Sequence, residues 1–318
     1  MTKTKIGLGL AALGRPEYIN IRTDNAIDKS EEAFKKNAYL VLDEAYKLGV
    51  RYFDTAPSYG KGEAYLIKWN NDRNHTDVVL GTKWGYTYVA NWELGFEGKH
   101  EVKEHTLEKL KEQWKVSKHM LPKLKYYQVH SATFESGILK NQAVLNQLHQ
   151  IKKETGLIIG ITTSGANQKE VIDAALKVNI DGSSLFDSFQ VTYNVFEQST
   201  FSILKEALSQ GKKVIVKEAL ANGRVFQNEK FQGYKEQYKI LKALSKKYQV
   251  DADAVALRFV MENLQPTYVL SGASNKTHLS QNLQALNFSF TEEEIQLLQT
   301  LRTAPEAYWN ERNALNWN

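Results

Sequence analysis

Eight short runs of apolar and β-branched residues recur along the 318-residue chain, and longer stretches with helical spacing separate them. The runs cover residues 5–10, 50–55, 77–83, 125–130, 157–162, 187–192, 213–218 and 268–273. Apolar runs this short are typical of strands that are buried on both faces of a parallel sheet. Because parallel strands need a crossover between them, usually a helix, the alternation predicts an α/β fold with parallel strands.

Apolar residues repeat at helical spacing between the predicted strands. Two stripes, over residues 34–48 and 139–151, each indicate one buried helix face. Later helices are predicted over residues 101–120, 169–178, 200–210 and 234–247. Gly49, Gly156 and Gly211 each follow a predicted helix, where a left-handed C-cap favours a residue without a Cβ atom.

Two α/β architectures can hold these strands: an open doubly wound sheet and a closed (β/α)₈ barrel. A dinucleotide-binding doubly wound sheet carries Gly-x-Gly-x-x-Gly after a strand, whereas Gly7-Leu8-Gly9 lies inside the first run and lacks the third glycine. The even distribution of the runs favours the barrel. We therefore expect residues 1–318 to form a single (β/α)₈ TIM barrel, for which this length is ordinary.

Two aromatic segments interrupt the alternation, at residues 84–100 and 304–318. Loops that follow strands line the active mouth of a TIM barrel. Trp84, Tyr86 and Trp92 in the first segment are therefore candidate substrate contacts, although the same rings would also suit an ordinary packed cluster. The second segment forms a C-terminal tail whose role the sequence leaves open.

The charge of the chain does not by itself select a partner. The formal net charge is +5 and the pI about 9.0, but the densest run of lysines, at 109–125, alternates with acidic and apolar residues. This pattern indicates a solvated helix face rather than a nucleic-acid groove, so we expect no nucleic acid as a partner. The polar, mixed-charge composition is compatible with a monomer.

The chain contains no cysteine, which excludes disulfides, thiolate zinc sites, iron–sulfur clusters and thiol nucleophiles. The N-terminus carries no signal-peptide pattern, and no apolar run approaches the roughly 20 residues that span a bilayer. We therefore expect a cytoplasmic protein that does not enter a membrane. His100 and His105 are five residues apart and do not share a helix face, so no metal site is predicted.

Four ionisable residues stand at or just after the carboxyl ends of consecutive predicted strands. Asp54, Lys83 and His130 end the second, third and fourth strands, and Tyr59 lies in the turn after Asp54. In a TIM barrel these ends meet at the catalytic rim. Each residue alone has an ordinary explanation, as a helix cap, a packed ring or a solvated charge. Together they are the residue types of a proton-transfer site.

The chemistry of the four groups is complementary. A phenol with an ordinary pKa of about 10 is a poor acid catalyst near neutral pH. We expect the Lys83 ammonium to lower the pKa of Tyr59, Asp54 to hold Lys83 in place, and His130 to orient the substrate oxygen. Such a site would protonate an alkoxide while hydride reaches the carbon, or run in reverse.

At these residues the sequence resembles the aldo-keto reductase family, and the match covers residues 7–282. Its most specific motifs lie at residues 49–60, with Glu63 after them, 78–83 and 126–130. The resemblance implies an NAD(P)-dependent oxidoreductase in which Tyr59 is the general acid and base. The other members of the implied catalytic tetrad are Asp54, Lys83 and His130.

The resemblance also implies contacts near the nicotinamide. Gln190 matches the glutamine that holds the carboxamide in this family. Thr162 and Thr163 stand where members often carry Ser-Asn. Lys217 stands where an aromatic ring usually stacks on the nicotinamide, with Leu220 shortly after it. The aliphatic stem of Lys217 could cover the ring instead.

Residues 272–282 resemble the family's adenosine-phosphate segment, and closely its version in potassium-channel β-subunits. The cofactor contacts that this implies are Gly272, Ser274, His278, Gln281 and Asn282. Backbone amides at a helix N-terminus suit a phosphate, and we expect Ser274 to cap this helix as well. Family habit favours NADP (NADPH) as the cofactor; NAD is the alternative, because His278 takes the usual place of an arginine.

The residues and the resemblance together predict an NAD(P)-dependent aldo-keto reductase that reduces an aldehyde, a ketone or a sugar carbonyl, or oxidises the corresponding alcohol or aldose. The alternative is a regulatory or sensor subunit that binds the nicotinamide cofactor with little turnover, as the channel-subunit-like segment suggests. The intact tetrad favours the enzyme. The sequence identifies neither the physiological substrate nor the direction of the reaction.

Overall fold

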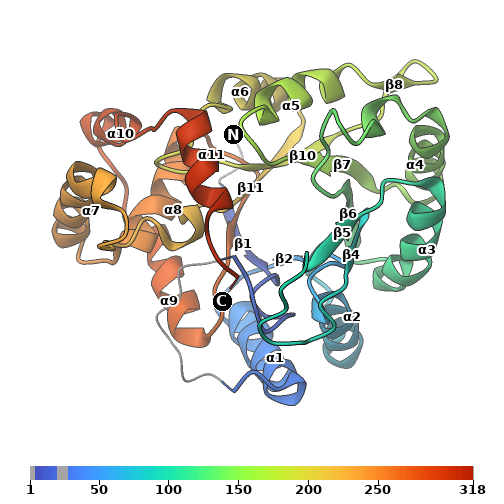
Figure 1. The fold of residues 1–318 in the computed structure, drawn as a ribbon, viewed down its shortest axis with the longest axis horizontal. Coiled ribbons are helices and arrows are strands. Elements are labelled where there is room, and N and C mark those ends of the chain that lie inside the picture. The colour runs from blue at the N-terminus through green and yellow to red at the C-terminus, as the bar shows by residue number, and fades with distance from the viewer. Residues whose placement is uncertain (1–3, 20–27, 318) are drawn as a thin grey trace.

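A computed structural model describes residues 4–19 and 28–317. Eight parallel strands form a closed barrel with helices around it (Figure 1). The barrel strands are β1 Lys5–Gly9, β2 Tyr52–Asp54, β3 Val79–Trp84, β6 Leu124–Val129, β7 Ile158–Thr162, β10 Ser188–Thr192, β11 Lys213–Lys217 and β12 Tyr268–Ser271. They pair in the order β1, β12, β11, β10, β7, β6, β3 and β2, which closes on β1. Each predicted run overlaps one of these strands, so the TIM barrel is confirmed.

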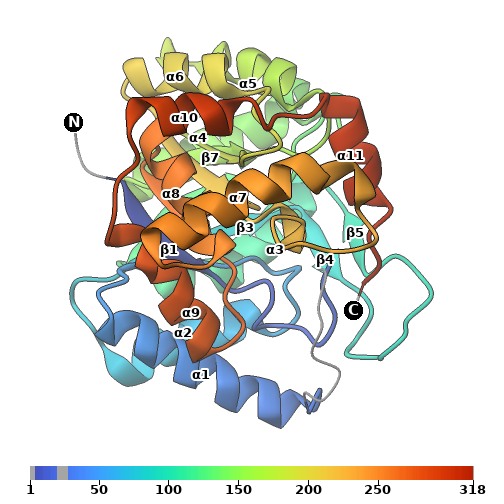
Figure 2. The same cartoon turned by 90° about the vertical axis from the view of Figure 1, so that its left-hand side faces the viewer.

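Most of the α-helices surround the barrel, and some pack on other helices rather than on the strands (Figures 1 and 2). Their bounds are α1 Glu31–Lys47, α2 Gly62–Arg73, α3 Leu107–Ser117, α4 Gln142–Thr155, α5 Gln168–Leu176, α6 Phe201–Ser209, α7 Lys235–Tyr248, α8 Ala252–Asn263, α9 Lys276–Leu283, α10 Glu292–Gln299 and α11 Pro305–Asn313. Short 3₁₀ turns are η1 Lys118–Met120, η2 Ile138–Lys140, η3 Ala221–Gly223, η4 Gln232–Tyr234 and η5 Gln284–Leu286. The left-handed glycines predicted after helices are confirmed: Gly49, Gly156 and Gly211 have φ of 91°, 70° and 78°.

One helix prediction differs from the structure. Glu101–Lys103 forms strand β5, which pairs antiparallel with β4 (Tyr86–Tyr88), so α3 begins at Leu107 rather than at residue 101. Helices α2, α10 and α11 lie outside the predicted helix ranges, as does α8. Nearly all residues of α8 are buried, and its sequence therefore lacks the amphipathic stripe of a surface helix.

Inside the barrel, a small cluster of buried side chains lies next to Asp54. Tyr52, Tyr126, Ile215 and Leu270 form a small buried cluster of their own. Asp54 follows Tyr52 by two residues and therefore faces the same side of its strand, nearer the carboxyl end. The Tyr52 hydroxyl donates a hydrogen bond of 2.9 Å to Asp54 Oδ2. This hydrogen bond from the barrel interior holds the Asp54 carboxylate in position.

Gly81 in β3 leaves the space that the Tyr52 side chain needs. A Cβ atom at Gly81 would lie 2.3 Å from the Tyr52 hydroxyl oxygen, far inside contact distance. The neighbouring strands β2 and β3 pair with Asp54 opposite Gly81. The glycine therefore lets the Tyr52 hydroxyl reach the carboxylate of Asp54.

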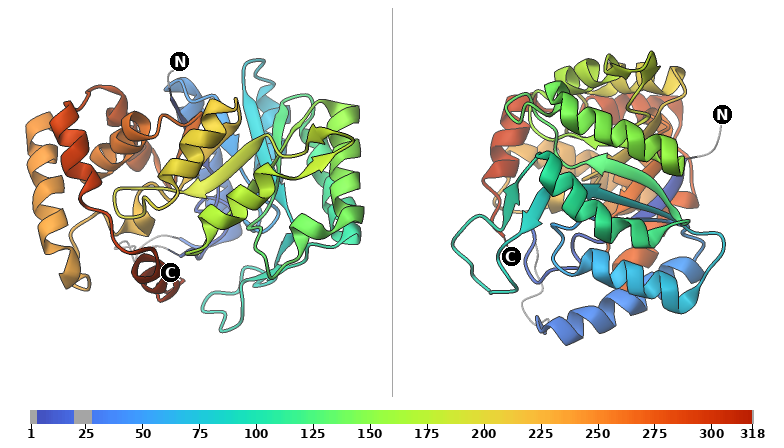
Figure 3. Two further views of the ribbon diagram at one scale, coloured as in Figure 1. Left: turned by 90° about the horizontal axis from the view of Figure 1, so that it is seen from above. Right: turned by 90° about the vertical axis from the view of Figure 1, so that its right-hand side faces the viewer.

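Both aromatic segments lie at the carboxyl end of the barrel. The loop between β4 and β5 projects beside that end, and α11 lies on the same side of the molecule (Figures 2 and 3). A β-bridge between Ile19 and Trp317 joins the loop after β1 to the tail. A further small hairpin, β8 (Asn179–Ile180) and β9 (Ser183–Ser184), precedes β10. Residues 1–3, 20–27 and 318 of the predicted domain and tail lie outside the described residues. No helix in the described part of the chain is long and apolar enough to cross a membrane.

Candidate active site

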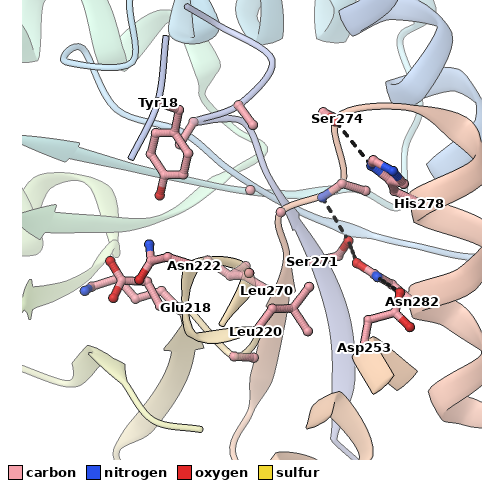
Figure 4. A pocket seen from close by; sticks show the side chains of 18 of the residues that line it. Tyr18, Glu218, Leu220, Asn222, Asp253, Leu270, Ser271, Ser274, His278 and Asn282 are labelled. Atoms are coloured by element: carbon pink, nitrogen blue, oxygen red, sulfur yellow. Dashed lines mark hydrogen bonds between the residues drawn. The ribbon is translucent and has the colours of Figure 1, made fainter. Parts of the chain in front are cut away.

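A pocket of about 470 Å³ opens at the carboxyl ends of the strands. Its wall includes Asp54 and Tyr59 at one end and His278 and Asn282 of α9 at the other. Figure 4 shows Glu218 and its neighbours on one side of this space and the α9 residues on the other. The pocket thus joins two of the four predicted catalytic residues to the 272–282 segment.

Asp54 and Lys83 form a buried ion pair at the ends of β2 and β3. Lys83 Nζ donates to Asp54 Oδ1 and, over 2.9 Å, to the Thr55 carbonyl oxygen. Asp54 Oδ2 accepts from the Tyr52 hydroxyl and from Gln190 Nε2, each over 2.9 Å. Because both charges are almost completely buried and hydrogen-bonded, they are fixed relative to the pocket.

Tyr59 stands beside this ion pair and is partly exposed. Its ring centroid lies 4.8 Å from Lys83 Nζ and 5.3 Å from the Arg15 guanidinium. The pKa of Tyr59 is raised well above its ordinary value, chiefly because burial disfavours the phenolate and also because Asp54 and Glu101 are near. The expected net lowering of the Tyr59 pKa is wrong for this state, because burial and the nearby carboxylates outweigh the cations. The phenol is therefore protonated at neutral pH.

His130 follows β6 and approaches Tyr59 from the side. The two rings meet edge to face with centroids 5.7 Å apart, and the Tyr86 ring lies 4.8 Å from His130. Nδ1 of His130 lies 3.3 Å from Ser58 Oγ, which leaves Nε2 for another partner. Burial, together with the nearby Lys83 ammonium, lowers the pKa of His130 well below its ordinary value. The imidazole is therefore neutral and can hydrogen-bond a substrate oxygen without adding charge.

Arg15 is a charged residue at the site that the sequence does not predict. It is buried, pairs with Glu101 and donates to the Ser58 carbonyl oxygen over 3.1 Å. Its guanidinium also lies 5.0 Å from the Tyr18 ring centroid. Arg15 comes from the loop after β1 and Glu101 from β5, so no local sequence signal places either beside Tyr59.

Lys217 and the adjacent Glu218 place opposite charges in the pocket wall. Lys217 Nζ donates to Ser164 Oγ over 3.0 Å and to Thr192 Oγ1 over 2.8 Å. Burial lowers the pKa of Lys217 to about 8. Burial would raise the pKa of Glu218, but the charges of Arg312 and Lys217 outweigh it and lower the pKa to about 2. Arg312 of α11 donates to Glu218 over 2.9 Å.

Comparison with known proteins agrees with this geometry, because residues 5–303 match the model of the aldo/keto reductase family. The chain belongs to this family. It is 24% identical over 303 residues to the aldo-keto reductase ausK of Aspergillus calidoustus, covering 84% of this chain and 73% of that protein. It is 26% identical over 293 residues to the uncharacterized oxidoreductase YqkF of Bacillus subtilis (strain 168), covering 84% and 88%. The holo form of the aldo-keto reductase AKR11C1 from Bacillus halodurans shares the fold, with a TM-score of 0.69, 22% identity and coverage of 96% and 94%.

Aldo/keto reductases are NAD(P)-dependent oxidoreductases, and the pocket fits a nicotinamide cofactor. Gln190 Oε1 is buried without a hydrogen-bond partner, while Asp54 holds the other end of the same amide. A carboxamide N–H is the kind of donor that this acceptor lacks. Thr162 Oγ1 accepts a backbone N–H over 2.7 Å, and Thr163 Oγ1 is buried without a partner. Neither threonine lines the pocket, whereas Leu220 does.

The segment 272–282 of this reductase lines the other end of the pocket. The residues it contributes are Gly272, Ser274, His278, Gln281 and Asn282, as well as Ala273. Asn275, rather than Ser274, caps α9, because Asn275 Oδ1 accepts the His278 backbone N–H over 2.8 Å. The capping prediction for Ser274 is therefore wrong. Its hydroxyl instead lies 3.3 Å from His278 Nδ1 (Figure 4).

None of the three predicted substrate contacts lines the pocket, and only Tyr86 lies beside the tetrad. Trp84 is completely buried. It follows Lys83 in β3, and because successive strand residues face opposite sides, it points away from the barrel interior. Trp92 packs edge to face on Phe34 of α1, with centroids 5.5 Å apart. The alternation of strand faces was the signal that could have excluded Trp84.

Several other pocket residues were missed. The charged and polar ones are Tyr18, Glu218, Asn222, Gln227, Asn228, Asp251, Asp253 and Ser271. Asn222 has a φ of 56°, a conformation that is uncommon for residues other than glycine and often found at functional sites. The Asn222-Gly223 pair is a recognisable turn signal, so this part of the wall could have been predicted.

Proposed function

We propose that this reductase transfers hydride between a nicotinamide cofactor and a small carbonyl compound, either an aldehyde, a ketone or a sugar. In the reverse direction it would oxidise the corresponding alcohol or aldose. The observation that carries the proposal is the protonated Tyr59 phenol, partly exposed and backed by the buried Asp54–Lys83 pair. A proton donor so supported suits the formation of an alcohol from a carbonyl.

Tyr59 supplies the proton in the reductive direction. A nicotinamide cofactor, whose carboxamide Gln190 would hold, would supply hydride for the carbonyl carbon, and the electron pair of the carbonyl bond would move to oxygen. The Tyr59 hydroxyl then gives its proton to that oxygen. Lys83 Nζ, 4.8 Å from the ring centroid, stabilises the phenolate that remains. In the oxidative direction the phenolate takes the proton back.

His130 and Asp54 position the reacting groups. Nε2 of the neutral His130 is available for the substrate oxygen, because Nδ1 faces Ser58 Oγ. Asp54 holds both Lys83 and Gln190, so one carboxylate links the lysine beside the Tyr59 proton donor to the residue that would hold the carboxamide. Removal of Asp54 would therefore disturb proton transfer and cofactor orientation together.

The substitution Tyr59→Phe tests the proposed mechanism. The reaction is followed as oxidation of NADPH and of NADH with a panel of aldehydes, ketones and sugars, and in reverse with alcohols and aldoses. We expect kcat to fall by about 10³-fold in Tyr59→Phe, since the proton donor is lost. Cofactor affinity, measured by fluorescence titration, should stay within about twofold, because the phenol is not a binding group.

Tyr46→Phe is the matched control, because the Tyr46 hydroxyl contacts Asp77 and lies outside the pocket. It should keep wild-type turnover. Normal turnover in Tyr59→Phe would contradict the mechanism. Tight cofactor binding by the wild type without turnover of any panel compound, in either direction, would instead favour a sensor subunit.

A further inference from the structure

Two carboxylates stand at the end of the pocket that is remote from Tyr59. If this protein carries out the proposed reaction, the reactive nicotinamide must meet the substrate at Tyr59. The adenosine half of the cofactor must then extend along the pocket toward α8 and α9. Asp251 and Asp253, from the start of α8, line that end together with His278 and Gln281 of α9.

Asp251 occupies the N-cap position of α8, but its side chain does not cap the helix. It is the N-cap residue of α8, with φ −82° and ψ 167°, where an aspartate normally accepts an amide N–H of its own helix. Its side chain makes no such hydrogen bond. Asp251 Oδ2 instead accepts from Gln281 Nε2 of α9 over 3.0 Å. The carboxylate is exposed and belongs to the pocket wall, so its charge is available to a ligand.

Asp253 adds a second acidic group beside it. It is buried, and its Oδ2 accepts from Asn282 Nδ2 over 2.6 Å (Figure 4). Asn282 in turn accepts from Ser271 Oγ over 2.6 Å. The buried Asp253 thus holds α9 against α8 through Asn282, whereas the exposed Asp251 is the carboxylate that a ligand can reach.

No lysine or arginine among the described pocket residues balances these carboxylates at the adenosine end. Lys217 is the cation of the described pocket wall, and it is held by Ser164 and Thr192 at the tetrad end. His278 does line the adenosine end, but its Nδ1 lies 3.3 Å from Ser274 Oγ and 3.2 Å from Asn275 Nδ2. The usual cationic fork for a 2′-phosphate is therefore missing from this part of the wall.

We infer that this reductase selects NAD(H) over NADP(H), and that Asp251 is the residue that sets this preference. A 2′-phosphate would bring a charge of nearly −2 next to a carboxylate, which repels it. A free ribose hydroxyl, in contrast, donates hydrogen bonds to a carboxylate. The inference rests on the proposed function in one respect, namely the assignment of the adenosine half to the α8–α9 end of the pocket.

Equilibrium binding of four ligands tests this inference without turnover. Titrations in a phosphate-free buffer compare NADH with NADPH, and 5′-AMP with 2′,5′-ADP, which isolate the adenosine end. We expect the wild type to bind NADH at least about tenfold more tightly than NADPH, and 5′-AMP more tightly than 2′,5′-ADP. Tighter binding of NADPH by the wild type would overturn the inference.

Asp251→Asn removes the charge while it keeps an oxygen that can accept from Gln281. The Kd for NADPH should fall by about fivefold to tenfold, and the Kd for NADH should stay the same or rise, so the preference narrows. Asp72→Asn, an exposed aspartate on α2, is the matched control and should leave the ratio unchanged. An unchanged ratio in Asp251→Asn would contradict the role of Asp251.

The same titrations on Tyr59→Phe separate the two proposals. That variant should keep the wild-type preference for NADH, because Tyr59 is remote from the adenosine end. If Tyr59→Phe retained turnover while NADH still bound more tightly, the mechanism would fail and the inference would stand. A preference for NADPH together with loss of turnover in Tyr59→Phe would support the mechanism and overturn the inference.

Discussion

At the scale of single residues, Lys217 is the side chain whose environment departs most from its sequence interpretation. Its stem is expected to cover the nicotinamide ring. In the structure its ammonium is tied to two hydroxyls, from Ser164 and Thr192, and its pKa falls to about 8 because burial disfavours the charge. A lysine that titrates this close to neutral pH makes the pocket sensitive to mild alkali.

Stability should therefore depend on pH through Lys217. In the unfolded chain its pKa is the ordinary 10.5, so between about pH 8 and that value the unfolded state binds the extra proton. Wild-type stability relative to Lys217→Met should rise with pH in this window, by at most about 1.4 kcal/mol per pH unit. Urea unfolding at about pH 7.5 and about pH 9.5 measures the change.

Lys213→Met, at the exposed start of the same strand, is the control, and its stability difference from the wild type should not show this slope. If the difference in unfolding free energy between the wild type and Lys217→Met does not change with pH across this window, Lys217 does not have the lowered pKa.

At the scale of elements, the pairing of β2 with β3 positions Asp54 and Lys83. Gly81 is paired with Asp54 across the two strands. Because Gly81 has no side chain, the Tyr52 ring has room to place its hydroxyl within hydrogen-bond distance of the Asp54 carboxylate. The next inward residue of β3 is Lys83, which meets Asp54 across the same strand pair. Two neighbouring strands therefore build both the support and the charge of the site.

Gly81→Ala should destabilise the barrel and disturb the site together. The added Cβ would lie 2.3 Å from the Tyr52 hydroxyl oxygen, so Tyr52 must move and release Asp54. We expect a loss of about 1–3 kcal/mol in unfolding free energy, with kcat reduced because Asp54 no longer holds Lys83 in place. Thermal and urea unfolding measure the first, and the NAD(P)H assay the second.

Gly233→Ala is the matched control, because a Cβ atom there meets nothing within 4 Å. Its unfolding free energy should stay within about 0.5 kcal/mol of the wild type. Full stability in Gly81→Ala would mean that Tyr52 has room to shift, and the proposed support of Asp54 would be wrong.

At the scale of the whole molecule, the tail closes over the barrel mouth. Arg312 of α11 donates to Glu218 over 2.9 Å, and the Tyr308 hydroxyl accepts from Asn194 over 2.9 Å. Trp317 lies against the Arg15 guanidinium, 4.7 Å from its ring centroid. The C-terminal segment therefore contacts residues of both the β1 loop and the end of β11, around the pocket.

A double-mutant cycle should reveal how strongly the tail is attached. Arg312→Met leaves the buried Glu218 without its arginine and should cost about 2–4 kcal/mol of unfolding free energy. Adding Glu218→Gln should recover part of that loss, since the unpaired charge is removed as well. Urea unfolding of the wild type, both single variants and the double variant gives the coupling free energy between Arg312 and Glu218.

The exposed pair Arg73–Asp43 provides the comparison, and Arg73→Met should cost less than about 1 kcal/mol. Equal losses in Arg312→Met and Arg73→Met would show that the tail is only loosely attached.

The barrel strands could be predicted from the sequence because each is a local apolar run. That Asp54, Tyr59, Lys83 and His130 would lie close together could be predicted because they stand at or just after the ends of consecutive strands. The strand at residues 101–103 could not be predicted, because nothing local reveals its pairing with β4. The aromatic ring of Trp84 suggests a substrate contact, but strand alternation turns that ring away from the barrel interior.

The (β/α)₈ barrel, and the position of Asp54, Tyr59, Lys83 and His130 at the carboxyl ends of its strands, follow from local patterns along the chain. The charge state of Tyr59 and the acidic character of the pocket's far end depend on contacts that form only when the chain folds. The raised pKa of Tyr59 depends on burial and on carboxylates that include Glu101. The acidic end of the pocket depends on α8 meeting α9. Electrostatic effects sum over neighbours in space, and folding brings those neighbours from distant parts of the chain.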